Sequence, residues 1–106
     1  HHEISVLKPD GAARTTDQRP TVVAGPLCES GDVFTQEEGG TVIPRTLPTA
    51  EIGDWLVFHD AGAYGASMSS NYNTRPLTPE VLIDGGEVRL IRRRQTVAEL
   101  LALENC

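Results

Sequence analysis

Two short segments of this chain combine residue types that can do acid–base or nucleophilic chemistry. Residues 28–32, Cys-Glu-Ser-Gly-Asp, place a thiol beside a carboxylate in a glycine-containing stretch that follows an apolar run. Residues 62–66, Gly-Ala-Tyr-Gly-Ala, place the phenol of Tyr64 among small residues. Reactive groups on loops at strand ends are typical of a functional site rather than of a core, so both segments are candidates.

Each candidate residue has a chemical and a purely structural interpretation. Cys28 can act as a nucleophile, a proton donor or a metal ligand, but a lone cysteine is also a common small buried residue. Glu29 suits the binding of an ammonium group, or it is a solvated surface charge. The phenol of Tyr64 can donate a hydrogen bond to a phosphate, or it packs. Asp32 is expected to form a turn or to cap a helix rather than to act in catalysis.

Other arrangements of reactive residues are not expected. Cys28 does not form a thiol-protease triad with His59 and Asp60, because adjacent side chains at a strand end point to opposite faces. The three histidines and two cysteines show no metal-ligand spacing, so no metal site is predicted. A disulfide framework is not indicated, since Cys28 and Cys106 are far apart and Cys106 ends the chain.

The elements that position these segments are mostly short strands. The expected strands cover residues 21–24, 41–47, 55–59, 80–83 and 87–91. Pro44 makes the second of these an edge strand. The last two form a hairpin, because either the Asp84-Gly85 pair or the Gly85-Gly86 pair supplies the positive φ angles of a tight turn. Turns are expected at residues 8–11 and 51–54, a polar loop covers residues 12–19, and residues 32–35 fit either a strand or a helical turn.

The C-terminal end of the chain has a helical pattern. Thr96 followed by Glu99 matches a capping box, in which each side chain bonds to the backbone of the other residue. Val97, Leu100 and Leu101 follow helical spacing, so one short helix docked by its leucines is expected. The pattern as a whole is mainly β with one short C-terminal helix, in a single domain of residues 1–106.

Composition narrows the classes of partner. A length of 106 residues allows one domain with a modest core, and the net charge of −6 argues against nucleic acid. Residues 92–94 are the one basic cluster, which fits a solvated strand end better than a phosphate patch. No apolar stretch is long enough to cross a membrane and no signal peptide is visible, so the expected location is cytoplasmic. Lys8 is the only lysine.

Several stretches resemble one enzyme family. Residues 28–32 resemble the Cys-Glu-Ser-Gly-Asp motif of bacterial diaminopimelate decarboxylases, and residues 62–73 resemble a later motif of the same family. Residues 90–96, with the leucine-rich end, resemble the C-terminus of these enzymes. Residues 2–5 resemble the stretch where the chain has left an N-terminal barrel, so at least one of the two starting histidines is expected to be native.

The resemblance implies a fold and partners. The family is alanine-racemase-like and pyridoxal-phosphate-dependent, with an N-terminal (β/α)8 barrel that carries the cofactor on a lysine. Its C-terminal domain is a β-barrel or sandwich with Greek-key-like connections, and the active sites lie at a homodimer interface. This chain resembles the C-terminal domain, and Lys8 matches none of the family's functional positions. The isolated chain is therefore expected to be inactive, as a fragment that needs the barrel domain as its partner.

The resemblance also implies residue roles. Cys28 would be a catalytic proton donor after loss of carbon dioxide, and Glu29 would bind the distal ammonium of the substrate, both at the partner subunit's cofactor. Tyr64 would contact cofactor and substrate in its own subunit. Glu29 favours meso-2,6-diaminopimelate, converted to L-lysine and CO2 in lysine biosynthesis, over ornithine or arginine. Two alternatives stay open: the same domain of an ornithine or arginine decarboxylase, and a free-standing β-barrel binding module.

Overall fold

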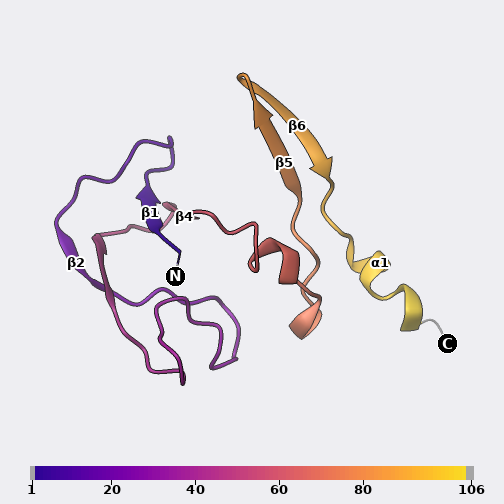
Figure 1. Cartoon of the computed structure of the whole chain (residues 1–106), viewed down its shortest axis with the longest axis horizontal. Helices are drawn as coiled ribbons and strands as arrows, with labels where there is room; N and C mark the ends of the chain where they lie inside the picture. The colour runs from indigo at the N-terminus through magenta and orange to yellow at the C-terminus, as the bar shows by residue number, and fades with distance from the viewer. Residues whose placement is uncertain (1, 105–106) are drawn as a thin grey trace. The chain divides into compact units, whose positions relative to one another are not determined.

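The computed structural model describes residues 2–104 of the chain, which has two compact units, His1–Ala61 and Gly62–Cys106 (Figure 1). Short antiparallel strand pairs dominate both units, and one short α-helix follows the last strand. The prediction of a mainly β chain with one short helix near its C-terminus is confirmed. The predictions that concern His1 and Cys106 fall on residues outside the described part.

The first unit contains two strand pairs. Strand β1 (Ile4–Leu7) pairs antiparallel with β4 (Trp55–Phe58). Strand β2 (Gln18–Thr21) pairs antiparallel with β3 (Arg45–Pro48). Strands β1 and β3 also contact each other, so the two pairs share one core.

The core of the first unit is small and apolar. It consists of Ile4, Val6, Val23 and Leu47, which are 4–7% exposed, with Phe58 packed against them. Ile4 and Val6 point to the same side because side chains alternate along a strand. The apolar run of residues 4–7 thus supplies two of the four buried apolar residues.

The two turns predicted in the first unit are present. Gly11 closes the turn of residues 8–11 by donating its N–H to the carbonyl of Lys8 at 2.9 Å, and its φ is 89°. Gly53 has a φ of 99° in the turn of residues 51–54. Both angles lie in the left-handed region, which glycine adopts without steric cost.

A bidentate ion pair ties the loop after β1 to the turn before β4. Arg14 Nε donates to Asp54 Oδ2 at 2.7 Å and its Nη2 to Oδ1 at 2.8 Å, with Glu51 3.2 Å from Nη2. The Asp54 side chain is only 2% exposed. The hydrogen bond from Arg14, followed by that from the Glu51 N–H, lowers the pKa of Asp54 to about 2. Asp54 therefore stays ionised.

The bounds predicted for two strands of the first unit are wrong. The strand expected at residues 21–24 lies earlier, at Gln18–Thr21, partly within the stretch expected to be a loop. The strand expected at residues 41–47 is Arg45–Pro48. Exposed polar residues carry most of β2, so no apolar period marks it. Its place is set by pairing with a strand that is distant in sequence.

The second unit contains the predicted hairpin. Strand β5 (Glu80–Asp84) pairs antiparallel with β6 (Glu87–Arg92), and Asp84 lies opposite Glu87. The two connecting residues, Gly85 and Gly86, have φ angles of 55° and 84°. Positive φ at both positions is the type I′ geometry that fits the twist of a hairpin.

Helix α1 (Val97–Leu100) has the predicted cap. The Thr96 hydroxyl accepts a hydrogen bond from the Glu99 N–H at 3.1 Å. The expected docking by leucines is wrong for the described residues, because α1 has no buried residue and Leu101 is 40% exposed. Three-residue 3-10 helices occupy Ala66–Met68, Tyr72–Thr74 and Ala102–Glu104. Within residues 2–104, every helix falls short of the length and apolarity that crossing a membrane requires.

Candidate functional site

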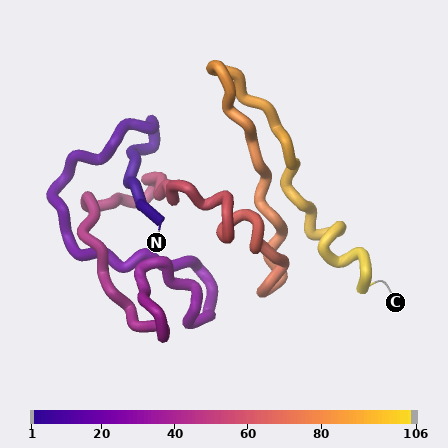
Figure 2. Tube along the Cα trace, viewed as in Figure 1, coloured from indigo at the N-terminus to yellow at the C-terminus, as the bar shows by residue number. Residues whose placement is uncertain are grey.

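The loop that carries Cys28 leaves the core of the first unit and returns to it (Figure 2). Its base is a bridge between Ala24 and Val33. The Gly25 N–H donates to the carbonyl of Asp32 at 2.8 Å, and the Asp32 N–H donates to the carbonyl of Glu29 at 3.0 Å. The candidate thiol and carboxylate thus lie on a short closed loop with its own backbone hydrogen bonds.

The carboxylate of Glu29 is held by the loop that carries it. Its Oε1 accepts a hydrogen bond from the Gly31 N–H at 2.9 Å and lies 3.4 Å from the Ser30 hydroxyl. The side chain is half-buried. A carboxylate has about four lone-pair sites, so it can accept several N–H donors at once. This arrangement is compatible with binding an ammonium group by a pre-oriented carboxylate.

Cys28 is exposed and carries a free thiol. The structural alternative, a small residue buried in a core, is therefore wrong for the part of the chain that the structure describes. An accessible thiol in a polar loop can exchange a proton with a group placed against it. The structure brings Cys28 and Glu29 together as sequence neighbours on one loop, and it leaves the thiol accessible.

Tyr64 belongs to the second unit and is 82% exposed. Its φ is 64°, and its N–H donates to the Ser67 hydroxyl at 2.9 Å. A bulky residue with positive φ is an outlier that the surrounding backbone must hold in place. The phenol of Tyr64 does not pack against the described residues. It is therefore available to a group outside them.

A side-chain amide network, which sequence reasoning missed, fixes the segment after Tyr64. Asn71 Nδ2 donates to Gln95 Oε1 at 2.6 Å and to the carbonyl of Arg75 at 3.0 Å. The same Gln95 oxygen accepts the Leu77 N–H at 2.9 Å. The network ties residues 71–77 to the end of β6. Both amides lie in stretches that the resemblance had marked, which was the only signal in the sequence.

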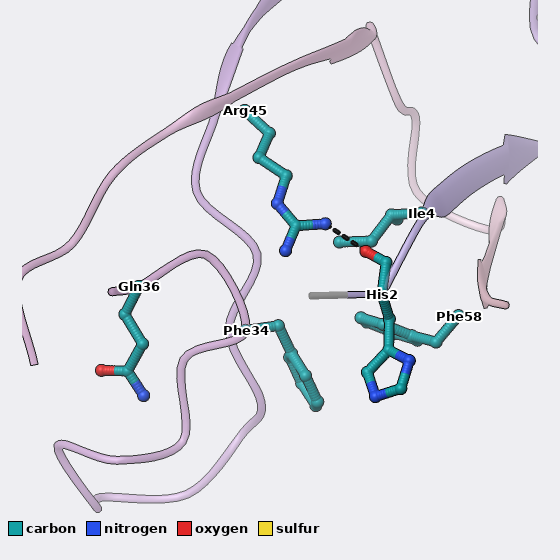
Figure 3. Close-up of a pocket in the computed structure, with 6 residues that line it drawn as sticks. All are labelled: His2, Ile4, Phe34, Gln36, Arg45 and Phe58. Carbon is teal, nitrogen blue, oxygen red and sulfur yellow. Dashed lines mark hydrogen bonds between the residues drawn. The ribbon is translucent and has the colours of Figure 1, made fainter. Parts of the chain in front are cut away.

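A pocket lies beside the candidate loop (Figure 3). It has a volume of about 150 Å3, and its lining residues are His2, Ile4, Phe34, Gln36, Arg45 and Phe58. Arg45 Nη1 donates to the backbone carbonyl of His2. The rings of Phe34 and Phe58 contact each other, with their centroids 4.4 Å apart. Gln36 Nε2 donates to the carbonyl of Gly31 at 3.4 Å. One wall of the pocket is therefore bonded to the loop that bears Glu29.

His59 and the basic cluster have partners within the fold. His59 Nε2 lies 2.7 Å from the hydroxyl of Ser5 in β1. Arg92 pairs with Glu80 at 3.1 Å, and Arg93 pairs with Glu99 at 2.7 Å. The pairing with Arg93 lowers the pKa of the Glu99 carboxyl. These contacts stabilise the second unit locally.

The residues of this chain fit contact with a pyridoxal cofactor but not its covalent attachment. An exposed thiol, a held carboxylate and an exposed phenol can all reach a group carried by another part of a protein. The only amine of a lysine is that of Lys8, and its positive charge contributes to lowering the pKa of the Asp54 carboxyl. Lys8 lies in the turn of residues 8–11, where its carbonyl accepts the Gly11 N–H at 2.9 Å, and not on the loop of Cys28.

Comparison with known proteins gives consistent similarities. Residues 1–62 match the family model of the pyridoxal-dependent decarboxylase C-terminal sheet domain. The chain is 70% identical over 104 residues to a diaminopimelate decarboxylase of Streptomyces coelicolor. The matched region covers 98% of this chain and 24% of that protein.

Solved structures agree with this similarity. A crystal structure of diaminopimelate decarboxylase is 67% identical, with a TM-score of 0.92 over 98% of this chain and 25% of that one. The enzyme of Helicobacter pylori complexed with L-lysine is 35% identical, with a TM-score of 0.77 over 97% of this chain and 23% of that one. The chain spans about a quarter of the length of the curated relatives that it matches.

Proposed function

The chain belongs to the pyridoxal-dependent decarboxylase family, and from this premise we propose that it is the C-terminal domain of a diaminopimelate decarboxylase. The intact enzyme would convert meso-2,6-diaminopimelate to L-lysine and CO2. The observation that carries the proposal is the exposed Cys28 thiol beside the held Glu29 carboxylate, on a chain similar to diaminopimelate decarboxylases over nearly its whole length. Residues 1–106 would act as one domain, since the similarity runs through both compact units.

Pyridoxal phosphate, when bound, withdraws electrons from the substrate carbon that loses carbon dioxide. Cys28 would hold a proton on Sγ and deliver it to that carbon, as a positioned general acid. Glu29 would pair with the distal ammonium of the substrate through its pre-oriented carboxylate. The phenol of Tyr64 would donate a hydrogen bond to the cofactor phosphate and line the substrate site. Together, the three residues would bind the cofactor, orient the substrate and protonate its reacting carbon.

We further propose that Cys28 and Glu29 serve the cofactor of the partner subunit in a homodimer, whereas Tyr64 serves that of its own subunit. The exposure of Cys28 and Tyr64 is compatible with such contacts, because the described residues leave the thiol and the phenol open to groups from outside. Lys8, the one lysine of the chain, lies in the turn of residues 8–11 and not on the candidate loop. The covalent lysine must then come from the barrel domain, and the isolated chain would be inactive. A cytoplasmic location belongs to the same proposal.

Two other functions are less well supported. An ornithine or arginine decarboxylase would share the fold, but the relatives with high identity are named diaminopimelate decarboxylases. The Helicobacter pylori diaminopimelate decarboxylase, at 35% identity, is complexed with L-lysine. A free-standing binding module would have no use for an exposed thiol beside a held carboxylate. The glutamate at position 29, in a stretch that resembles the motif of diaminopimelate decarboxylases, is the residue that favours diaminopimelate over ornithine.

Steady-state kinetics of the intact enzyme test the proposal. L-Lysine formation is measured from meso-diaminopimelate, with L-ornithine and L-arginine as competing substrates. Cys28→Ala should lower kcat by about 10²–10⁴-fold with little change in KM, because a proton donor acts mainly in the transition state. Cys106→Ala is the matched control and should leave kcat unchanged. Faster turnover of ornithine or arginine, or a normal kcat for Cys28→Ala, would refute the proposal.

A further inference from the structure

One residue of the candidate loop, Asp32, bonds to three different places in it. Its side-chain Oδ2 accepts a hydrogen bond from the Leu27 N–H at 3.0 Å. Its carbonyl accepts from the Gly25 N–H at 2.8 Å, and its own N–H donates to the carbonyl of Glu29 at 3.0 Å. The backbone just before Cys28 and the backbone of Glu29 are thus both fixed by the same residue.

Gly25 leaves the space that the Asp32 carboxylate occupies. A Cβ atom built on Gly25 would lie 2.1 Å from Oδ2, 2.3 Å from Oδ1 and 2.4 Å from Cγ of Asp32. Separations below 3.0 Å do not occur between real atoms of this kind, so any side chain here would expel the carboxylate. Gly25 is not among the glycines with positive φ, so the need for glycine is one of space.

We propose that Gly25 and Asp32 form a latch that positions Cys28 and Glu29 for the reaction. Asp32 is a positioning residue, which acts through the backbone of Leu27 and Glu29 and touches no reacting atom. The Asp32 carboxylate fixes the backbone at Leu27, one residue before the thiol, by accepting the Leu27 N–H. Without it, the Leu27 N–H loses its acceptor, and the backbone just before Cys28 and Glu29 is no longer tied to the far side of the loop.

The latch needs an acceptor oxygen rather than a negative charge. The group that Asp32 accepts from is a neutral backbone N–H, and no described residue forms an ion pair with this carboxylate. An asparagine side chain has the same shape and one carbonyl oxygen that can accept the same N–H. Asp32→Asn should therefore keep the latch closed, whereas Asp32→Ala should open it.

Amide hydrogen exchange in the intact enzyme tests the latch without using activity. Exchange of the Leu27 N–H is measured in wild type, Asp32→Ala, Asp32→Asn and Gly25→Ala. Loss of one hydrogen bond should speed exchange by about fivefold in Asp32→Ala and Gly25→Ala, and Asp32→Asn should match the wild type. Asp10→Ala is the matched control, since it removes an equivalent bond to the Ala12 N–H at 2.9 Å in a turn away from the site. For the exchange measurement alone, Gly31→Ala controls for substitution of a loop glycine: its added Cβ would meet only Glu29 Oε1 at 3.4 Å, so the Leu27 N–H should exchange as in the wild type.

Kinetics with meso-diaminopimelate test the positioning role, and this arm rests on the proposed function. Per correctly folded, cofactor-loaded enzyme, Asp32→Ala should lower kcat and raise KM together, by about fivefold each, because both Cys28 and Glu29 are displaced. Asp32→Asn should restore both. Wild-type exchange at Leu27 in Asp32→Ala, or exchange in Asp32→Asn as fast as in Asp32→Ala, would overturn the latch. Fast exchange with unchanged kcat and KM would overturn the positioning role. If the wild-type enzyme does not turn over this substrate, the proposed function fails while the exchange arm still decides the latch.

Discussion

Replacing Glu29 by glutamine separates the charge of this side chain from its shape. In the structure, Glu29 Oε1 accepts the Gly31 N–H at 2.9 Å, and an amide oxygen in the same place can accept the same bond. The loop should therefore keep its conformation in Glu29→Gln. What disappears is the negative charge that we propose pairs with the distal ammonium of the substrate.

The size of the effect follows from the burial of this carboxylate. Removing one partner of a desolvated charge pair costs about 2–5 kcal/mol, and Glu29 is half-buried rather than fully buried, so we expect the lower part of that range. A loss of about 2–3 kcal/mol corresponds to a decrease in kcat/KM of roughly 30- to 150-fold. Glu29→Ala should cost more, because it also removes the acceptor for the Gly31 N–H.

The assay compares two substrates in the intact enzyme. Values of kcat/KM are measured for meso-diaminopimelate and for 2-aminopimelate, which lacks the distal ammonium. Glu29→Gln should lower kcat/KM for the first substrate and leave it nearly unchanged for the second, with cofactor absorbance as a control for loading. An equal loss for both substrates would show that Glu29 acts on the loop or on the cofactor, and the charge-pairing argument would then be wrong.

Three further predictions concern the chain itself. The wild type should be more stable than Asp54→Asn by its full margin above about pH 4, and this difference in the free energy of unfolding should close as the pH falls toward about 2. The reason is that the pKa of Asp54 is about 2 in the folded chain and 3.8 ordinarily. Urea unfolding followed by Trp55 fluorescence measures the difference, and a constant difference across this pH range would contradict the prediction. Leu47→Ala should lower the free energy of unfolding by about 2–4 kcal/mol because Leu47 is one of four buried apolar residues, and a loss below about 1 kcal/mol would mean that the site relaxes. The isolated chain should form no reducible bond to pyridoxal phosphate, since its one lysine, Lys8, lies in the turn of residues 8–11 and not on the candidate loop; borohydride trapping with mass spectrometry would reveal a labelled Lys8 if this is wrong.

Local features of the fold were predictable because their causes are local. The β5–β6 hairpin depends on Gly85 and Gly86, whose positive φ angles are intrinsic to glycine. The cap of α1 depends on the hydroxyl of Thr96 and the N–H of Glu99, three residues apart. Strand β2 was not predictable, because its polar, exposed residues carry no apolar period and its pairing partner is distant in sequence.

The candidate site divides in the same way. Sequence proximity places Cys28 beside Glu29, and the family motif marks Tyr64. The sequence does not reveal that a backbone N–H of the loop orients the Glu29 carboxylate, because this depends on how the loop closes. It also does not reveal why residue 25 is glycine, since the reason is the space taken by the carboxylate of Asp32.

The central claim is that this chain supplies Cys28 and Glu29 to the active site of its partner subunit. Hybrid dimers test it most directly. One parent enzyme carries Glu29→Gln, the other lacks the covalent lysine of the barrel domain, and each homodimer alone should be nearly inactive. Random one-to-one exchange makes half of the dimers hybrid, each with one complete site of two, so the mixture should recover about a quarter of wild-type activity. No recovery, with subunit exchange demonstrated by native mass spectrometry, would contradict the claim that Glu29 acts across the dimer interface.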